Sequence, residues 1–289
     1  MINFNRDQLQ ADYTKELENG ITHFYSGQWG KADSTFTSLI KQDPKAPEAY
    51  FFKAMVPFWK YFFAGKAKND AKQFLIFSEN AIDVSEKYLK ANEKDTSIVL
   101  LLSGLYGYRA LVSADLGEYF TAAKSGLAGF DFTKQILKMD ENLAETKIGK
   151  GIYYYMSGSV PDNGKWITKL LGMNGTKDDA FVELELAAQS NSRVNVDANL
   201  ILTYLYLKEF KPYQAFKTSL RLTKMYPTNS IFLFLHADTL EKIGKKEDAL
   251  AYYNQVILQN NNDIEHLTLN AKVKSEELRY SLNQSFGTK

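Results

Sequence analysis

Residues 20–44 read GITHFYSGQWGKADSTFTSLIKQDP, and one spacing inside this stretch decides the fold. Counted from Gly20, five small, apolar or turn-forming residues follow at offsets of 7, 12, 16, 19 and 24: Gly27, Ala32, Phe36, Leu39 and Pro44. Upstream, apolar residues recur at helical spacing at Leu9, Tyr13, Leu17, Ile21 and Phe24. The pattern predicts two helices joined by a tight turn at Gly27, the second helix ending before Pro44.

The same offsets return near the other end of the chain. There the series is Ala237, Gly244, Ala249, Tyr253, Val256 and Asn261. A third copy in register is Thr203, Phe210, Ala215, Ser219, Leu222 and Pro227. Because the copies come from independent stretches, they indicate one helical hairpin repeated along the chain.

The repeated positions describe how two helices pack. Helices approach closely where side chains are small, so Gly20 and Ala32 are expected where the two backbones meet, and Phe36 in the adjoining gap. A small residue, a Gly turn, an Ala, an aromatic residue and a terminal Pro resemble the tetratricopeptide repeat (TPR). The resemblance is specific for residues 13–46 and 196–262 and weaker between them.

The resemblance implies an all-α fold, a right-handed α-α superhelix of about six hairpins with a C-terminal capping helix. No linker rich in Pro, Gly or Ser divides the chain, so a single TPR-like solenoid domain over residues 1–289 is expected. The predicted hairpins are 7–46, 47–92, 96–140, 143–192 with an insertion at 157–176, 196–228 and 230–262, followed by the capping helix 263–284.

Composition argues against some classes of partner. With 35 Lys and Arg against 34 Asp and Glu the formal charge is +1, and no basic cluster is interleaved with aromatic residues, so nucleic acid is not expected. The apolar window 98–112 contains Arg109 and is too short for a membrane span, so a buried repeat helix is expected there. The start of the chain lacks an apolar signal segment. We therefore expect a cytoplasmic protein if Met1 is the native start, or a periplasmic or exported one if a signal peptide has been removed.

Catalytic chemistry finds no support. The chain has no Cys, and its histidines, His23, His236 and His266, do not have metal-binding spacing. Residues 148–151 lack the upstream Gly and following Ser or Thr of a phosphate loop. We predict a non-enzymatic protein without metal or cofactor.

In the TPR family the first helix of each hairpin lines the concave surface. Carried over to this chain, that face is predicted to present an aromatic groove with one fixed cation, Arg109, suited to an apolar or amphipathic segment. The groove residues are Phe24, Tyr25, Met55, Phe58, Trp59, Leu105, Tyr108, Arg109, Tyr155 and Tyr204. The alternative is that most of these rings pack between neighbouring helices. Among them, Trp59, Tyr108 and Arg109 are the leading candidates for partner contact.

Residues 157–176 (SGSVPDNGKWITKLLGMNGT) form an insertion that no repeat requires. A short helix within it is expected to expose Trp166, Leu170 and Leu171 along one side. Long ordered insertions are often functional, but this one can equally fold back and plug the groove.

The sequence thus favours a protein-protein interaction scaffold that binds a peptide or helix of an unidentified partner in its concave groove. One alternative is an accessory protein of the cell envelope that binds a small hydrophobic ligand or lipid. Another is a self-assembling homo-oligomer.

Overall fold

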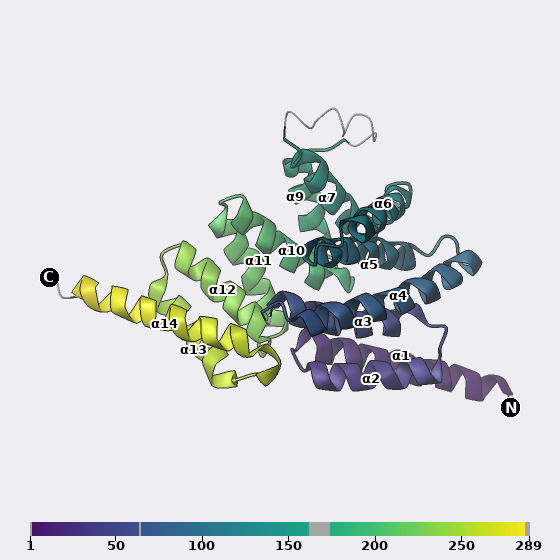
Figure 1. Ribbon diagram of the computed structural model, residues 1–289, viewed down its shortest axis with the longest axis horizontal. Coiled ribbons are helices and arrows are strands. Elements are labelled where there is room, and N and C mark those ends of the chain that lie inside the picture. The colour runs from purple at the N-terminus through teal and green to yellow at the C-terminus, as the bar shows by residue number, and fades with distance from the viewer. Residues whose placement is uncertain (1, 64, 162–173, 287–289) are drawn as a thin grey trace. The chain divides into compact units, whose positions relative to one another are not determined.

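The computed structural model describes residues 2–63, 65–161 and 174–286, and all regular elements in these ranges are helices (Figure 1). The first helices of the hairpins are α1 (Ile2–Tyr25), α3 (Pro47–Phe63), α5 (Thr96–Asp115), α7 (Ala144–Gly158), α10 (Val194–Lys208) and α12 (Ser230–Lys242). The second helices are α2 (Trp29–Gln42), α4 (Lys68–Ala91), α6 (Tyr119–Ile136), α9 (Lys177–Ala188), α11 (Pro212–Met225) and α13 (Lys246–Gln259). The 3₁₀ turn η2 (Asn262–Ile264) and α14 (Glu265–Phe286) follow. The predicted all-α fold of helical hairpins is confirmed.

Local chemistry sets where these helices begin. Pro47 and Pro212 are the first residues of α3 and α11, where the missing amide hydrogen of proline is not needed. Asp95 caps α5 by accepting from the amide of Ile98 at 3.2 Å. Thr176 begins α9 with a reciprocal capping box to Asp179. The delayed second helix predicted after the insertion is therefore a properly capped element.

The packing expected inside the first hairpin is confirmed. A Cβ atom added to Gly20 would lie 2.7 Å from Cε1 of Phe36, closer than real atoms approach. Ala32 and Phe36 are fully buried. Gly20 thus allows α1 to approach α2, and the ring of Phe36 fills the space beside it.

The helices form two compact units. Unit 1 combines residues 1–88 with residues 219–289, and unit 2 comprises residues 89–218. Unit 1 therefore brings the first two hairpins against the last one, and long-range polar contacts join them. The side-chain amide of Asn229 donates to the carbonyl of Tyr25 at 2.8 Å, although 204 residues separate them. Lys60 pairs with Asp263 at 2.6 Å.

Asn229 has two roles in unit 1. Its side-chain oxygen accepts from the amides of Ile231 and Phe232, at 2.8 and 3.2 Å, and so caps α12. Its side-chain NH₂ is the group that reaches Tyr25. The residue is completely buried, and one side chain therefore both starts a C-terminal helix and ties it to an N-terminal one.

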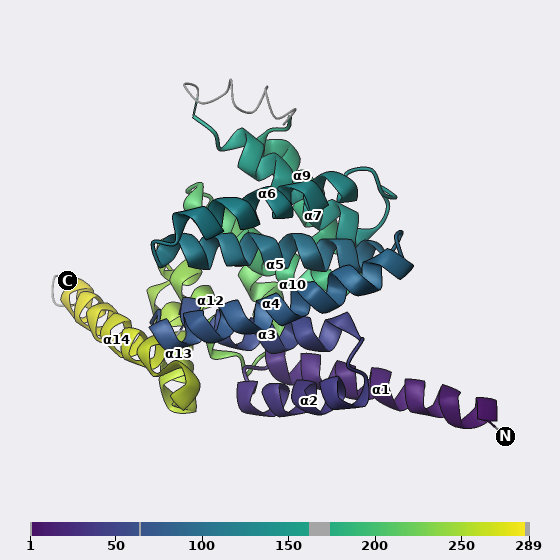
Figure 2. The ribbon, with the colours of Figure 1, turned by 45° about the vertical axis from the view of Figure 1, so that its right-hand side comes forward.

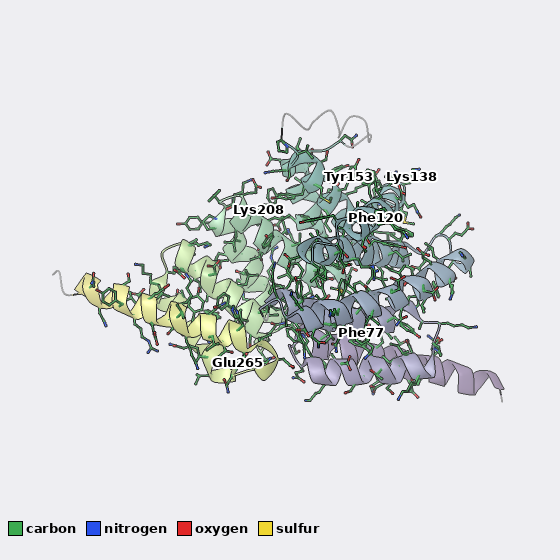
Figure 3. The ribbon with its side chains drawn as sticks, in the orientation of Figure 1. Phe77, Phe120, Lys138, Tyr153, Lys208 and Glu265 are labelled. Atoms are coloured by element: carbon green, nitrogen blue, oxygen red, sulfur yellow. The ribbon has the colours of Figure 1, made fainter. Side chains whose placement is uncertain are left out.

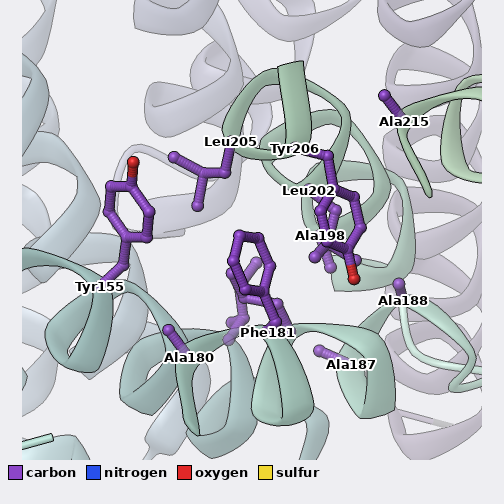
Figure 4. Close-up of a cluster of buried hydrophobic side chains, with 12 residues drawn as sticks. Tyr155, Ala180, Phe181, Ala187, Ala188, Ala198, Leu202, Leu205, Tyr206 and Ala215 are labelled. Carbon is purple, nitrogen blue, oxygen red and sulfur yellow. The ribbon is translucent and has the colours of Figure 1, made fainter. Parts of the chain in front are cut away.

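Unit 2 is built from consecutive hairpins. Its central helices enclose a cluster of buried apolar side chains, in which the rings of Phe181 and Tyr206 stack with centroids 4.5 Å apart (Figure 4). In the neighbouring hairpin α5 and α6 run side by side (Figure 2). Ser103 and Thr133 share a hydrogen bond of 2.8 Å across that pair.

Candidate interaction sites

Five of the ten predicted groove residues lie inside unit 1, each no more than 7% exposed: Phe24, Tyr25, Met55, Phe58 and Trp59. The chain's own rings surround them. The Trp59 ring lies 4.8 Å from Phe24 and 6.0 Å from Phe232, and Tyr25 lies 5.5 Å from Tyr226. Phe232 belongs to the last hairpin. These residues therefore form a core between the N- and C-terminal repeats, and the open groove expected from them is corrected accordingly.

The aromatic face of α3 continues beyond this core into a cavity of about 510 Å³. Phe58 packs on Phe62 and Trp59 on Phe63, with centroids 4.8 and 5.5 Å apart. The apolar lining comprises Phe62, Phe63, Ile231, Phe234, Leu235 and Leu267. Lys66, His266 and Asn270 add polar groups. The face predicted on α3 is thus covered along most of its length and open at its C-terminal end.

The glycine at position 65 shapes one wall of this cavity. Its φ is +106°, and an added Cβ would lie 3.2 Å from the imidazole of His266. Asn270 lies 3.2 Å from Nδ1 of the same ring. A side chain at position 65 would therefore strain the backbone and press against the ring of His266.

A second cluster lies in unit 2 around Tyr155. The Tyr155 hydroxyl donates to Glu209 at 2.7 Å, and Lys177 donates to the same carboxylate oxygen at 2.7 Å. The ammonium groups of Lys177 and Lys208 lie 5.6 and 5.7 Å from the centre of the Tyr155 ring (Figure 3 labels Lys208 on its helix). Two ammonium groups thus lie near the ring, and the Glu209 carboxylate links Lys177 to the Tyr155 hydroxyl.

Electrostatics in this cluster follow from these contacts. Burial, and then the hydrogen bond to Glu209, raise the pKa of Tyr155 to about 12. The hydrogen bond from Lys177, and then that from Tyr155, lower the pKa of Glu209. Glu209 is therefore a fixed anion and Tyr155 a fixed hydrogen-bond donor at neutral pH.

The family model described as tetratricopeptide repeat matches residues 232–260, which cover most of α12 and α13. This stretch of the chain is thus a tetratricopeptide repeat. Two of the solved structures that are similar to the chain are TPR proteins. A thermophilic TPR protein from Thermus thermophilus is 16% identical with a TM-score of 0.47, over 79% of this chain and 98% of its own. The TPR domain of P58(IPK) is 18% identical with a TM-score of 0.31, over 95% of this chain and 99% of its own. No curated protein matches the chain.

The remaining predicted groove residues differ in exposure. Leu105 is fully buried, whereas Tyr108 and Arg109 are half-buried. Burial, with Asp197 nearby, raises the pKa of the Tyr108 hydroxyl. Tyr204 is 63% exposed. Of the ten, Tyr204 is the most exposed. The insertion residues Trp166, Leu170 and Leu171 lie outside the described residues.

Within the described ranges, no group of three or more His, Cys, Asp or Glu side chains is placed to hold a metal ion. His236 is buried in the TPR hairpin α12–α13, with its Nδ1 2.8 Å from the Ser219 hydroxyl. That hydroxyl is also 3.0 Å from Thr239. Burial lowers the pKa of His236 to about 4, and Asp248 opposes this weakly. The histidine is therefore neutral at neutral pH, and a hydroxyl group lies beside its Nδ1.

One described helix, α5, is long and apolar enough to cross a membrane. It pairs with α6 as the first helix of a hairpin, and part of its apolar window is buried. A single helix of this kind is weak evidence for a membrane span.

Sequence reasoning missed the cavity and one turn. The cavity depends on α3, α12 and α14 meeting, and no local pattern signals contacts between segments so far apart in the sequence. The turn is the one at Phe210, which occupies the repeat position that is glycine at Gly27 and Gly244. A bulky residue at a glycine position was a signal available in the sequence.

Proposed function

We propose that this TPR protein is an interaction scaffold that holds an apolar segment of a partner protein in the cavity beside α3. TPR proteins generally bind protein partners and are generally non-enzymatic, and the fold indicates that coarser role. The single observation that carries the finer proposal is the cavity of about 510 Å³, which is lined by aromatic and aliphatic side chains. This volume is in the range of sites that accept large apolar groups.

The lining suits one or two large side chains of a peptide. Phe62, Phe63 and Phe234 offer ring faces and edges to an aromatic or aliphatic anchor. Lys66 and Asn270 can donate hydrogen bonds to the carbonyls that flank such an anchor. Buried aromatic anchors with a polar rim carry most of the binding free energy in protein interfaces. We therefore expect an apolar anchor to set affinity and the rim to set orientation.

A matched pair of substitutions tests this. Peptides would be selected on the wild-type protein from a phage-displayed random library, and their dissociation constants measured by calorimetry. Leu235→Trp puts extra volume into the cavity, whereas Leu258→Trp makes the same change on α13 at a position 83% exposed and not part of the cavity lining. Leu235→Trp should weaken binding at least about tenfold, which corresponds to about 1.4 kcal/mol. Leu258→Trp should leave it unchanged.

Equal affinity of the selected peptides for both variants would overturn the assignment of the cavity. Circular dichroism of each variant checks that the helices are intact. Native mass spectrometry of the purified protein covers the competing outcome, because a small apolar molecule held in the cavity would add its mass to the wild-type protein and not to Leu235→Trp.

A further inference from the structure

Four hairpin turns in this protein follow one backbone route. Gly27, Gly117, Phe210 and Gly244 each stand two residues past the end of a first helix, with φ of +74°, +80°, +56° and +81°. The amide of each donates to the carbonyl three residues earlier, at 3.1, 3.0, 3.2 and 3.0 Å. The next amide donates to the carbonyl five residues earlier, at 2.9, 2.8, 2.8 and 2.9 Å. This is the helix-ending motif that glycine normally completes.

Phe210 is the exception among the four. For a bulky residue a left-handed backbone is a genuine outlier, because its Cβ crowds the neighbouring carbonyl oxygen. The side chain is also 93% exposed, so the protein gains almost nothing from burying the ring. Position 210 thus combines a strained backbone with an exposed apolar ring, and a glycine there would have neither. Such outliers are found at functional sites.

Aromatic and positively charged side chains are exposed near Phe210 in the sequence. Tyr213, three residues along and at the start of α11, is 67% exposed. Lys208 and Lys217 are also exposed, on either side of the turn. The one carboxylate within this short stretch, Glu209, is already paired with Lys177 at 2.7 Å. The turn therefore presents a phenyl ring and a phenol in a positively charged setting.

We propose that Phe210 is an anchor that this chain inserts into an apolar pocket of a partner protein, and that the rim of this pocket carries carboxylates. A single projecting ring is matched by a concave host, and the lysines beside it are matched by acidic groups. The cavity beside α3 in a second copy is a poor host, because its polar groups include Lys66 and His266. This site lies in unit 2 and is independent of the partner proposed for the cavity in unit 1.

The first test is stability. Phe210→Gly relieves the strained backbone and removes an unburied ring, so its melting temperature should rise by about 2–4 °C, as for a modest gain in a chain of this size. A residue kept for function at the expense of stability shows this sign when it is replaced. A lower melting temperature for Phe210→Gly would show that the ring supports the fold, and would overturn the proposal.

The second test is partner contact. A photoreactive benzoylphenylalanine replaces Phe210 in one variant and Leu258, another exposed apolar residue, in a control. After irradiation in living cells, the protein crosslinked through position 210 would be identified and purified. Its affinity for the wild-type chain and for the variants would then be measured. Phe210→Gly should weaken binding at least about 30-fold. The double variant Lys208→Glu with Lys217→Glu should slow association, with the greatest effect at low salt.

Several outcomes would overturn the proposal. These are equal crosslinking through positions 210 and 258, crosslinks to a second copy of this chain, and unchanged affinity for Phe210→Gly. Sedimentation of the wild-type protein, but not Phe210→Gly, with vesicles containing phosphatidylserine would assign the ring to a lipid surface instead.

Discussion

The two units of this protein use their side chains in different ways. In unit 2, consecutive hairpins contact one another, as in a repeat array where each element meets its neighbours. In unit 1, hairpins from opposite ends of the chain meet, and residues 203 and 204 positions apart form an ion pair and a hydrogen bond. Rings in unit 1 pack mainly on other rings, whereas the buried Tyr155 ring in unit 2 also lies beside the ammonium groups of Lys177 and Lys208. The difference shows that helical hairpins of one chain can pack either with their sequence neighbours or with hairpins from the opposite end of the chain.

The largest expected difference in stability between the two units comes from substitution of Trp59. Trp59→Ala should reduce the free energy of unfolding by about 3–5 kcal/mol, because the ring is packed between Phe24 and Phe232. Tyr204→Ala in unit 2 should change it by less than about 0.5 kcal/mol, because that side chain is mostly exposed. Urea denaturation measures both. Similar losses would mean that the two units do not differ in this respect.

The contact between the chain ends can be isolated at Asn229. Asn229→Asp keeps the oxygen that caps α12 but replaces the NH₂ that reaches Tyr25, leaving a buried carbonyl facing a carboxylate. The loss should be about 2–3 kcal/mol. In Asn195→Asp the lost bond, to Ser190, is local and only partly buried, and the loss should be under about 1 kcal/mol. Equal losses in denaturation experiments would argue against an important tie between the ends.

The buried His236 predicts a pH dependence that belongs to unit 1. Its folded pKa is about 4, below the ordinary value of 6.5, so the fold favours the neutral ring. This contribution to stability is complete above about pH 6.5 and is lost as the pH falls toward 4. Between pH 7.5 and 5 it should remove about 2 kcal/mol. His236→Asn should abolish that part of the profile. A profile identical to wild type would show that the histidine does not titrate as proposed.

The turn glycines provide a test in which the two units should behave alike. An added Cβ at Gly117 in unit 2, or at Gly244 in unit 1, would have no atom within 4 Å, yet φ is +80° and +81°. Replacing each by Ala should therefore cost about 1 kcal/mol from backbone strain alone. Thermal melts of the two variants should agree. A negligible cost at both sites would remove the strain assigned to Phe210.

The smallest effect is expected at Tyr155. Tyr155→Phe removes the hydrogen bond to Glu209, which stays paired with Lys177. Because the cluster is partly exposed, the loss should be about 0.5–1 kcal/mol. The pKa of Glu209, followed by NMR, should rise in this variant, since one of the bonds that lowers it is gone. An unchanged pKa would mean that Lys177 alone controls the carboxylate.

Much of the fold was predictable because the repeat is a local code. Gly27 and Pro44 mark where helices end, Pro47 marks where one begins, and Gly20 marks where two backbones approach. Each of these effects acts within one hairpin, and the structure confirms each one.

The candidate interaction sites were less predictable than the fold. The repeat specifies which side of a helix faces inward, but not which side chains fill the space there. Trp59 and Phe24 were predicted to line a groove, yet both are buried, and the ring of Phe232 packs against Trp59. A residue 173 positions away from Trp59 leaves no local signal. Phe210 did leave one, but the exposure and the left-handed backbone were needed to interpret it.

The bond from Asn229 to Tyr25 also has a consequence for synthesis of the protein. A ribosome that adds about 5–20 residues per second needs roughly 10–40 s to pass from the acceptor to the donor. During that time the rings of α1 and α3 have emerged without the side chains that later cover them. The nascent chain thus exposes its most aromatic segment for longer than a simple repeat array would, and chaperone dependence should fall on the N-terminal hairpins.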